Sequence, residues 1–292
     1  MMKWNLTLWI AAAFVLTACP DEGKPVSVTG PKLLIKLKVD PDQERLDNIG
    51  NPSVIPSGHA AVDPVFNKIS AHYIELAPDL YTIIGQGEIL YKGEETEAGG
   101  ALAIDFNKAK LAVPGDVFLS IPIKDITPGT YRFPRVSVLY QNYDIPFVYN
   151  GADLTGTIAS FVGYNTFINQ YKINQETITV NDDKLQGYWG FEVNYMGFVT
   201  SFTGQGPAGA TTVPNPLFAT SPIPQGSCVL TGAFEDPLVI TGTETDDITM
   251  EITFSTNKSF EWQEINPDGK FDPNIGENVV DMGLRGMKVK VY

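Results

Sequence analysis

The stretch Lys32-Leu33-Leu34-Ile35-Lys36-Leu37-Lys38-Val39 decides the fold class, because apolar and basic side chains alternate along it. The odd positions are all apolar and fall on one face of an extended chain, whereas the three lysines fall on the opposite face. Residues 248–255 alternate in the same way. Such a period of two is typical of half-buried strands in an antiparallel sheet.

Short strands separated by turn residues continue through the rest of the chain. The 292 residues include 27 glycines and 21 prolines, and no segment carries apolar residues at helical spacing. Turns are expected at residues 114–116, 127–129, 150–151 and 181–183. Further strands are expected at residues 71–76, 88–91, 117–123, 135–140, 155–161, 176–180, 188–193, 238–241 and 287–291. We predict an all-β fold, an antiparallel sandwich or jelly roll with little helix, formed by one domain over residues 32–292.

Two stretches interrupt the strand pattern. Residues 40–68 contain several prolines and glycines and are expected to form a long ordered loop. Residues 205–227 carry five prolines and no charge, and stretches of ~20 residues without regular structure are uncommon inside compact domains and often functional. Leu217, Phe218 and Ile223 favour instead packing of this stretch on a sheet.

The N-terminus reads as an export signal. After Lys3 comes an apolar run of about 11 residues, which fits a signal peptide and is too short for the ~20 residues of a membrane-spanning helix. The run ends in Leu16-Thr17-Ala18-Cys19, which resembles the bacterial lipobox. That resemblance implies that residues 1–18 are removed and that Cys19 carries the acyl chains, which would anchor the protein firmly. An ordinary secretory signal with a chance cysteine is the alternative.

Residues 20–31 read as a flexible tether behind the anchor. Asp21 and Glu22 in this tether resemble the export signal of Bacteroidota surface lipoproteins. The resemblance implies an outer-membrane lipoprotein at the cell surface. A plain polar tether, which would leave the protein on the periplasmic face, is the alternative.

The charge balance argues against polyanionic partners. Without residues 1–18 the chain has 274 residues and a formal charge of −15, because the signal removes one lysine from a chain of charge −14. No block of Lys or Arg is present. Nucleic acid is therefore excluded as a partner class, and the membrane is expected to be contacted through the lipid anchor.

The two cysteines cannot form an intramolecular disulfide if Cys19 is acylated. Cys228 then has no disulfide partner, and it is expected to be a buried, inert thiol at the start of a strand. No base adjoins it in the sequence, so a nucleophilic role is not favoured.

Residues 264–277 are the best candidate for a metal site. Oxygen-bearing side chains alternate at the start of this segment, and Gly269 permits a sharp turn. The pattern resembles the D-x-N-x-D-G calcium loops of EF-hand-like and dockerin-like sites, although Glu replaces the first Asp and no helices flank it. A polar hairpin whose side chains bond local amides is the alternative. The expected calcium ligands are Glu264, Asn266, Asp268, Lys270 through its carbonyl, Asp272 and Glu277.

No catalytic signature stands out. The chain lacks G-x-S-x-G, H-E-x-x-H, P-loop and dinucleotide patterns. His72 lies on the same face of its expected strand as Ile74 and reads as a core histidine, and a metal site formed by His59 and His72 alone would be weak. A glycosidase needs only two facing carboxylates, which the sequence leaves open. The dense aromatic residues between 131 and 202 are expected to be mostly core, with sugar platforms as the alternative.

The chain as a whole resembles uncharacterised Bacteroidota surface lipoproteins, through residues 43–48 (QERLDN) and 281–286 (DMGLRG). Its order of strands is also similar to the MbnP-like family of secreted β proteins, some of which bind copper, but no residues carry over from that likeness. Neither resemblance implies an activity.

We therefore expect a binding or accessory module, stabilised by calcium and directed at a glycan or protein ligand, and the sequence favours this over an enzyme without excluding one. The alternatives are a hydrolase acting on polysaccharide and a structural component of an envelope complex. An aromatic row beside a groove would favour glycan binding. Two carboxylates roughly 5–9.5 Å apart across a cleft would favour the hydrolase, and a flat apolar patch would favour a protein partner.

Overall fold

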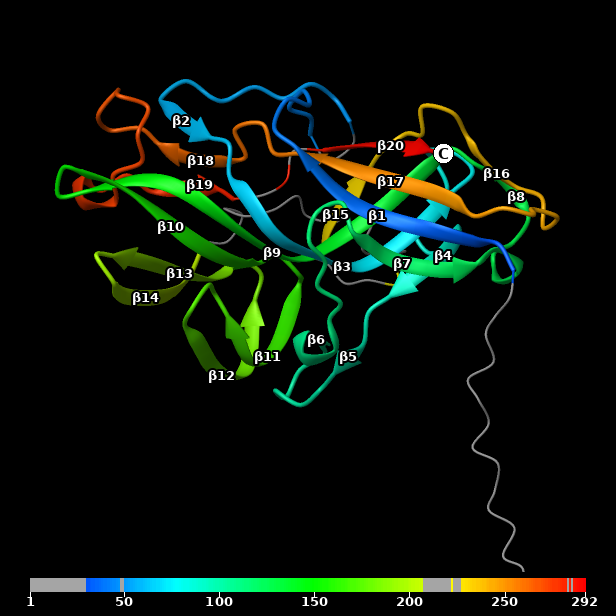
Figure 1. Ribbon diagram of the computed structural model, residues 1–292, viewed down its shortest axis with the longest axis horizontal. Coiled ribbons are helices and arrows are strands. Elements are labelled where there is room, and N and C mark those ends of the chain that lie inside the picture. The colour runs from blue at the N-terminus through cyan, green and yellow to red at the C-terminus, as the bar shows by residue number, and fades with distance from the viewer. Residues whose placement is uncertain (1–29, 48–49, 207–221, 223–226, 283, 285) are drawn as a thin grey trace, which may run out of the picture.

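The structure is a computed structural model that describes residues 30–47, 50–206, 222, 227–282, 284 and 286–292. It is an all-β sandwich of mostly antiparallel sheets, as the alternating sequence predicts (Figure 1). The described helical turns are single 3₁₀ turns: η1 (Phe106–Lys108), η2 (Ile123–Asp125) and η4 (Pro273–Ile275). None of the described helical segments is long and apolar enough to cross a membrane.

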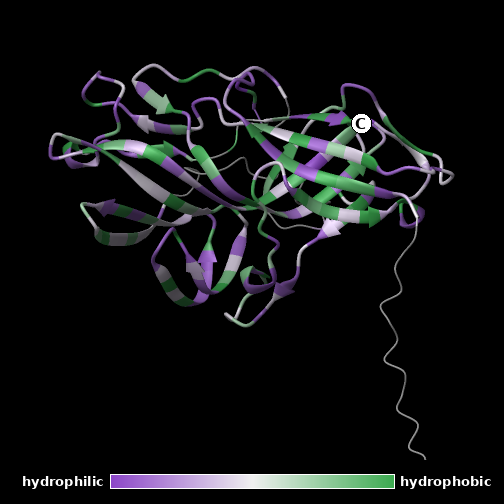
Figure 2. Cartoon of the chain, viewed as in Figure 1, coloured by the Kyte–Doolittle hydropathy of each residue, from purple (hydrophilic) through white to green (hydrophobic). Residues whose placement is uncertain are grey.

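One half of the sandwich is closed by a four-stranded sheet in the order β20-β17-β1-β7. Apolar and polar side chains alternate along β1 and β17 (Figure 2), and Leu33, Ile35 and Leu37 are fully buried. β1 pairs with β17 in parallel, whereas the other two pairs are antiparallel. The strands are β1 (Lys32–Asp40), β7 (Val117–Pro122), β17 (Ile248–Ser255) and β20 (Met287–Val291).

A long sheet in the order β14-β13-β10-β9-β3-β4, with β15 also paired to β9, runs through the whole molecule (Figure 1). β9 has 17 residues and contributes to three of the hydrophobic clusters, which places it at the centre of the fold. The strands are β3 (Val65–Ala77), β4 (Glu88–Lys92), β9 (Phe133–Tyr149), β10 (Ala152–Phe161), β13 (Tyr188–Tyr195), β14 (Phe198–Gln205) and β15 (Cys228–Thr231).

Three smaller sheets complete the described fold. Their orders are β12-β11-β6-β5, β19-β18-β2 and β16-β8. The first covers an aromatic cluster around Phe161, and the second contributes Phe260 and Trp262 to another cluster. The strands are β2 (His59–Val62), β5 (Glu95–Thr96), β6 (Ala103–Asp105), β8 (Gly129–Tyr131), β11 (Asn165–Lys172), β12 (Thr177–Leu185), β16 (Leu238–Ile240), β18 (Phe260–Gln263) and β19 (Val279–Asp281).

Two local predictions are wrong. Residues 40–68 are not one loop, because they contain β2 and the start of β3. Residues 181–183 lie inside β12 rather than at a turn, and Asn181 adopts a positive φ of 52° opposite a register shift in β11. A bulge uses the same turn-forming residues as a hairpin, which is why the sequence suggested a turn.

Other sequence predictions fall outside the described residues. They include the signal segment 1–18, the acylated Cys19 and most of the tether 20–31. Most of residues 205–227 also lie outside, including Leu217, Phe218 and Ile223.

Candidate ligand-binding cavity

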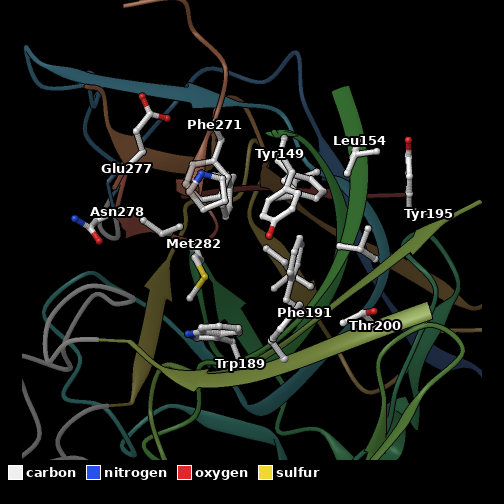
Figure 3. Close-up of a pocket in the computed structure, with 18 of the residues that line it drawn as sticks. Tyr149, Leu154, Trp189, Phe191, Tyr195, Thr200, Phe271, Glu277, Asn278 and Met282 are labelled. Atoms are coloured by element: carbon white, nitrogen blue, oxygen red, sulfur yellow. The ribbon is translucent and has the colours of Figure 1, made fainter. Parts of the chain in front are cut away.

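A cavity of about 1000 Å³ (Figure 3) is lined by β13, β14 and β18, which lie away from the β1–β17 sheet (Figure 1). β13 and β14 form one wall. The ends of β9 and β10 adjoin it, and they pack against Phe260 of β18, Phe271 and Met282, which contribute to the opposite wall. The cavity therefore lies between the β13–β14 hairpin and the small β19-β18-β2 sheet.

Strand alternation decides which side chains face this cavity. In β13, Trp189, Phe191 and Val193 line it. The alternate positions Tyr188 and Glu192 face the other side of the sheet, where Tyr188 packs in the aromatic cluster around Phe161 and Glu192 is buried. The paired strand β14 shows the same alternation, because its cavity-lining positions 198, 200 and 202 stand opposite Tyr195, Val193 and Phe191.

Two of these aromatic rings occupy the space above glycines. Gly204 pairs directly with Trp189, and a Cβ atom on Gly204 would lie 2.4 Å from Cζ2 of Trp189. A Cβ atom on Gly156 of β10 would lie 2.2 Å from Cε2 of Phe191. Both rings therefore lie down over the neighbouring strand, and Figure 3 shows Trp189 extended along the ribbon beneath it.

The other wall is a cluster of aromatic rings. The ring of Phe271 lies 5.3 Å from that of Phe260 and 5.6 Å from that of Trp262, measured between centroids. The carbonyl of Phe271 accepts a 2.7 Å hydrogen bond from the amide of Val148 in β9. This bond attaches the loop after β18 to the long sheet, so the two walls are joined near the cavity.

The described lining carries one carboxylate, Glu277, and backbone amides already donate hydrogen bonds to both of its oxygens. Glu277 is 4% exposed. Its Oε1 accepts hydrogen bonds from the amides of Ile265 and Asn266, and its Oε2 accepts one from the amide of Asp272. No Lys, Arg or His is among the described residues that line the cavity. The remaining polar side chains are neutral: Tyr149, Asn150, Tyr195, Thr200, Gln205 and Asn278, with the Trp189 indole N–H.

The predicted calcium loop supports one wall of the cavity through Glu277 and Phe271. Its carboxylates bond to the loop itself. Oε1 of Glu264 accepts from the amides of Asp268 and Gly269, and Oδ1 of Asp268 accepts from the amide of Lys270. Oδ2 of Asp268 accepts from the side-chain amide of Asn266.

The remaining members of the loop point to other partners. Oδ1 of Asp272 accepts from the amide of Asn274, and Nζ of Lys270 bonds Asp153 of β10 at 2.8 Å. Within the described ranges, no three Asp, Glu, His or Cys side chains converge as a metal site. The arrangement has the bonding of a polar hairpin, and calcium at this loop stays a prediction.

The two histidines contact different carboxylates. Nδ1 of His59 lies 2.6 Å from Oε1 of Glu261, whose other oxygen bonds Arg45. This contact ties the first residue of β2 to β18, at the back of the cavity wall. His72 is fully buried, as predicted, and its Nε2 lies 3.3 Å from Oε1 of Glu95.

Glu95 belongs to a charged group on the β12-β11-β6-β5 sheet. Burial raises the pKa of this carboxyl, but His72 and Lys92 outweigh that effect by hydrogen bonding and charge and hold the pKa at about 2. Tyr164 also donates a 3.1 Å hydrogen bond to Glu95. The carboxylate is thus a contact between β5 and β3 and does not line the cavity.

The sequence identified the aromatic region but not its hollow. Tyr140, Tyr143 and Tyr171 are buried core residues, as expected for most of the set, whereas Tyr149, Trp189 and Tyr195 line the cavity. The cavity could have been predicted from the pairing of large aromatic rings with glycines on adjacent strands. That pairing depends on strand register, which the sequence alone did not provide.

The motif at residues 281–286 is divided between the two halves of the molecule. Met282 lines the cavity, whereas Leu284 is buried in the closed core, and positions 283 and 285 lie outside the described residues.

Arg45, from the motif at 43–48, bonds Glu261 and the carbonyl of Lys258, and Asn48 lies outside the described residues. Cys228 is buried in β15.

Comparison of the chain with protein-family models, with curated proteins and with solved structures gives no significant match.

Proposed function

We propose that this protein is a lipid-anchored, extracytoplasmic binding protein that holds an uncharged hydrophobic small molecule in its cavity. The supporting observation is a hollow of about 1000 Å³ lined mainly by aromatic and aliphatic side chains. Small-molecule sites of this kind typically enclose ~300–1000 Å³ and use few polar groups. The anchor at Cys19 and the cell-surface location belong to the proposal.

The energetics favour an apolar ligand. Burying about 300 Å² of apolar ligand surface contributes about 7 kcal/mol, from which the cost of association must be subtracted. An anion would lose its hydration and find no Lys, Arg or His among the described lining residues. A cation would meet a single carboxylate, Glu277, whose oxygens already accept three amide hydrogen bonds.

The geometry does not favour the hydrolase alternative. Glu277 is the only acid among the described cavity-lining residues, so no second described carboxylate faces it across the hollow.

The exposed apolar residues nearby belong to the mouth of the same cavity. Phe198 is 80% exposed and Tyr195 is 48% exposed, and both are lining residues on the β13–β14 hairpin. Their exposure is expected of a cavity that opens to solvent, so a separate protein-binding patch is not needed to explain them.

The binding proposal is tested by titrating residues 19–292, carrying Cys19→Ser, with the uncharged fluorophore 1-N-phenylnaphthylamine. We expect its emission to rise and saturate. Val193→Asp places a charge on the cavity wall and should weaken binding at least about tenfold. Val199→Asp, on the opposite face of the paired strand, is the matched control. No saturable signal, or equal binding by both variants, would contradict the proposal.

The anchor is tested separately with the full chain in a bacterial host. Cys19→Ser should move the protein from the detergent phase to the aqueous phase, and protease added to intact cells should digest the wild type. Unchanged partitioning would refute the anchor, and digestion only after lysis would place the protein on the periplasmic face.

A further inference from the structure

We infer that the cavity selects a ligand with a flat, rigid ring system, a fused aromatic or polycyclic body without charge, over a flexible acyl chain or a sugar. This inference rests on the proposed function and names the ligand class of the same site. Three features carry it: the floor of the cavity, its opposite wall and its supply of polar partners.

The floor carries two aromatic rings from β13, one lying over β14 and the other over β10. Trp189 and Phe191 are two positions apart on β13, so their Cα atoms are separated by about 6.6 Å and both side chains face the cavity. Gly204 and Gly156 leave room for the rings to lie over the adjacent strands. If these positions carried a Cβ atom, the rings would have to rise into the hollow.

The orientation of Phe191 is also braced. The Phe147 ring stands at 76° to it, with 5.2 Å between centroids. This edge-to-face contact restricts the orientation of the Phe191 ring. The two lining rings of β9 and β13 therefore hold each other in place before any ligand arrives.

The opposite wall also presents rings. Phe260 and Phe271 line the cavity in a mutual edge-to-face contact at 74°. Figure 3 shows Phe271 and Tyr149 on the side of the cavity opposite Trp189. A rigid ring system between these walls can stack on one and meet the edges of the other, which are the two arrangements that aromatic groups prefer.

The polar partners disfavour the two competing ligand classes. A sugar can also stack on aromatic rings, but it brings several hydroxyl groups, and most of the described lining residues, among them Leu154, Val193 and Met282, offer them no hydrogen bonds. A fatty acid brings a carboxylate, and the described lining contains no Lys or Arg to receive it. The hydroxyl of Tyr149 points into the hollow (Figure 3), which suits a ligand with one or two neutral polar groups.

The test is displacement of 1-N-phenylnaphthylamine from the unacylated chain by three uncharged competitors: phenanthrene, 1-dodecanol and maltotetraose. We expect phenanthrene to compete at least about tenfold better than dodecanol, and maltotetraose not to compete. If dodecanol or maltotetraose competes as well as phenanthrene, the inference is wrong although the proposed function stands. If the fluorophore itself does not bind, the proposed function has failed.

Two variants examine the floor. Gly204→Ala should lift Trp189 and weaken phenanthrene at least about tenfold while changing dodecanol less than about threefold. Ser201→Ala, on the other face of the same strand, is the control and should change neither. Trp189→Leu keeps an apolar side chain without a ring and should show the same selective loss, even if Gly204→Ala does not fold. Equal losses for both competitors in Trp189→Leu would overturn the inference.

Discussion

The two halves of this sandwich share one strand pattern, but one half forms a filled core and the other forms a cavity. In the closed half, which the β20-β17-β1-β7 sheet covers, the alternate residues Leu33, Ile35 and Leu37 of β1 are completely buried against the long sheet. In the open half, the alternate residues Trp189 and Phe191 of β13 lie over glycines and leave a hollow. Both strands obey a period of two, so alternation alone does not distinguish a filled core from a binding cavity.

The difference lies in the residues opposite each strand. Aliphatic side chains from facing sheets interdigitate and fill the closed half. Glycines on β10 and β14 let large rings lie down, so the open half gains a smooth wall and loses packing between its layers. The closed half should therefore supply more of the stability, and the open half should supply the ligand site.

The largest expected effect is a contrast between two leucines. Leu37→Ala removes a fully buried side chain and should lower the free energy of unfolding by about 2–5 kcal/mol. Leu154→Ala, on the partly exposed cavity wall, should cost clearly less because no enclosed void is created. Urea unfolding of both variants measures the contrast, and equal losses would mean that the two halves are packed alike.

The next effect concerns the carboxylate that supports the cavity wall. Glu277→Ala leaves three loop amides without their acceptor and should cost about 1–3 kcal/mol. It should also weaken binding of the fluorophore, because the supported loop carries Phe271. The exposed Glu97→Ala is the control. Unchanged stability in Glu277→Ala would show that these bonds do not hold the wall.

Calcium would add a further stabilisation to the same loop. If residues 264–277 hold calcium at a tenfold excess over its dissociation constant, binding contributes about 1.4 kcal/mol. A chelator should then lower the melting temperature by a few degrees, and Asp268→Ala should remove the difference. An unchanged melting temperature would show that the loop is held without calcium.

A titration with acid separates the stability of the fold from the affinity of the cavity. The pKa of Glu95 is lowered from 4.5 to about 2 in the folded protein. Its contribution to stability is therefore complete above about pH 4.5 and is lost as the pH falls toward 2. Acid titration of the unfolding free energy should show this loss, and Glu95→Gln should reduce it.

Affinity for an uncharged ligand should stay constant as the pH falls below about 4.5, for as long as the protein remains folded, since Glu95 does not line the cavity. A parallel fall of affinity and stability below about pH 4.5 would contradict the separation of the two halves.

The sequence predicted what depends on local pattern and missed what depends on register. Alternation at residues 32–39 and the turn at Asn150-Gly151, where both residues have positive φ, were sufficient for the fold class and one hairpin. The floor of the cavity was not predictable in the same way, because Gly156 and Gly204 are distant in sequence from the rings above them. The segment at 264–277 was recognised as special, and the structure shows that its acids bond the loop's own amides.

The most direct test is a crystal structure of the unacylated chain grown with 9-bromophenanthrene, with the bromine located by anomalous scattering. We expect one strong bromine peak in the cavity, and the planar rings stacked on Trp189 and Phe191 with Phe271 opposite. A bromine peak elsewhere on the molecule, or a cavity filled by the protein's own side chains, would contradict the assignment of the open half as the ligand site.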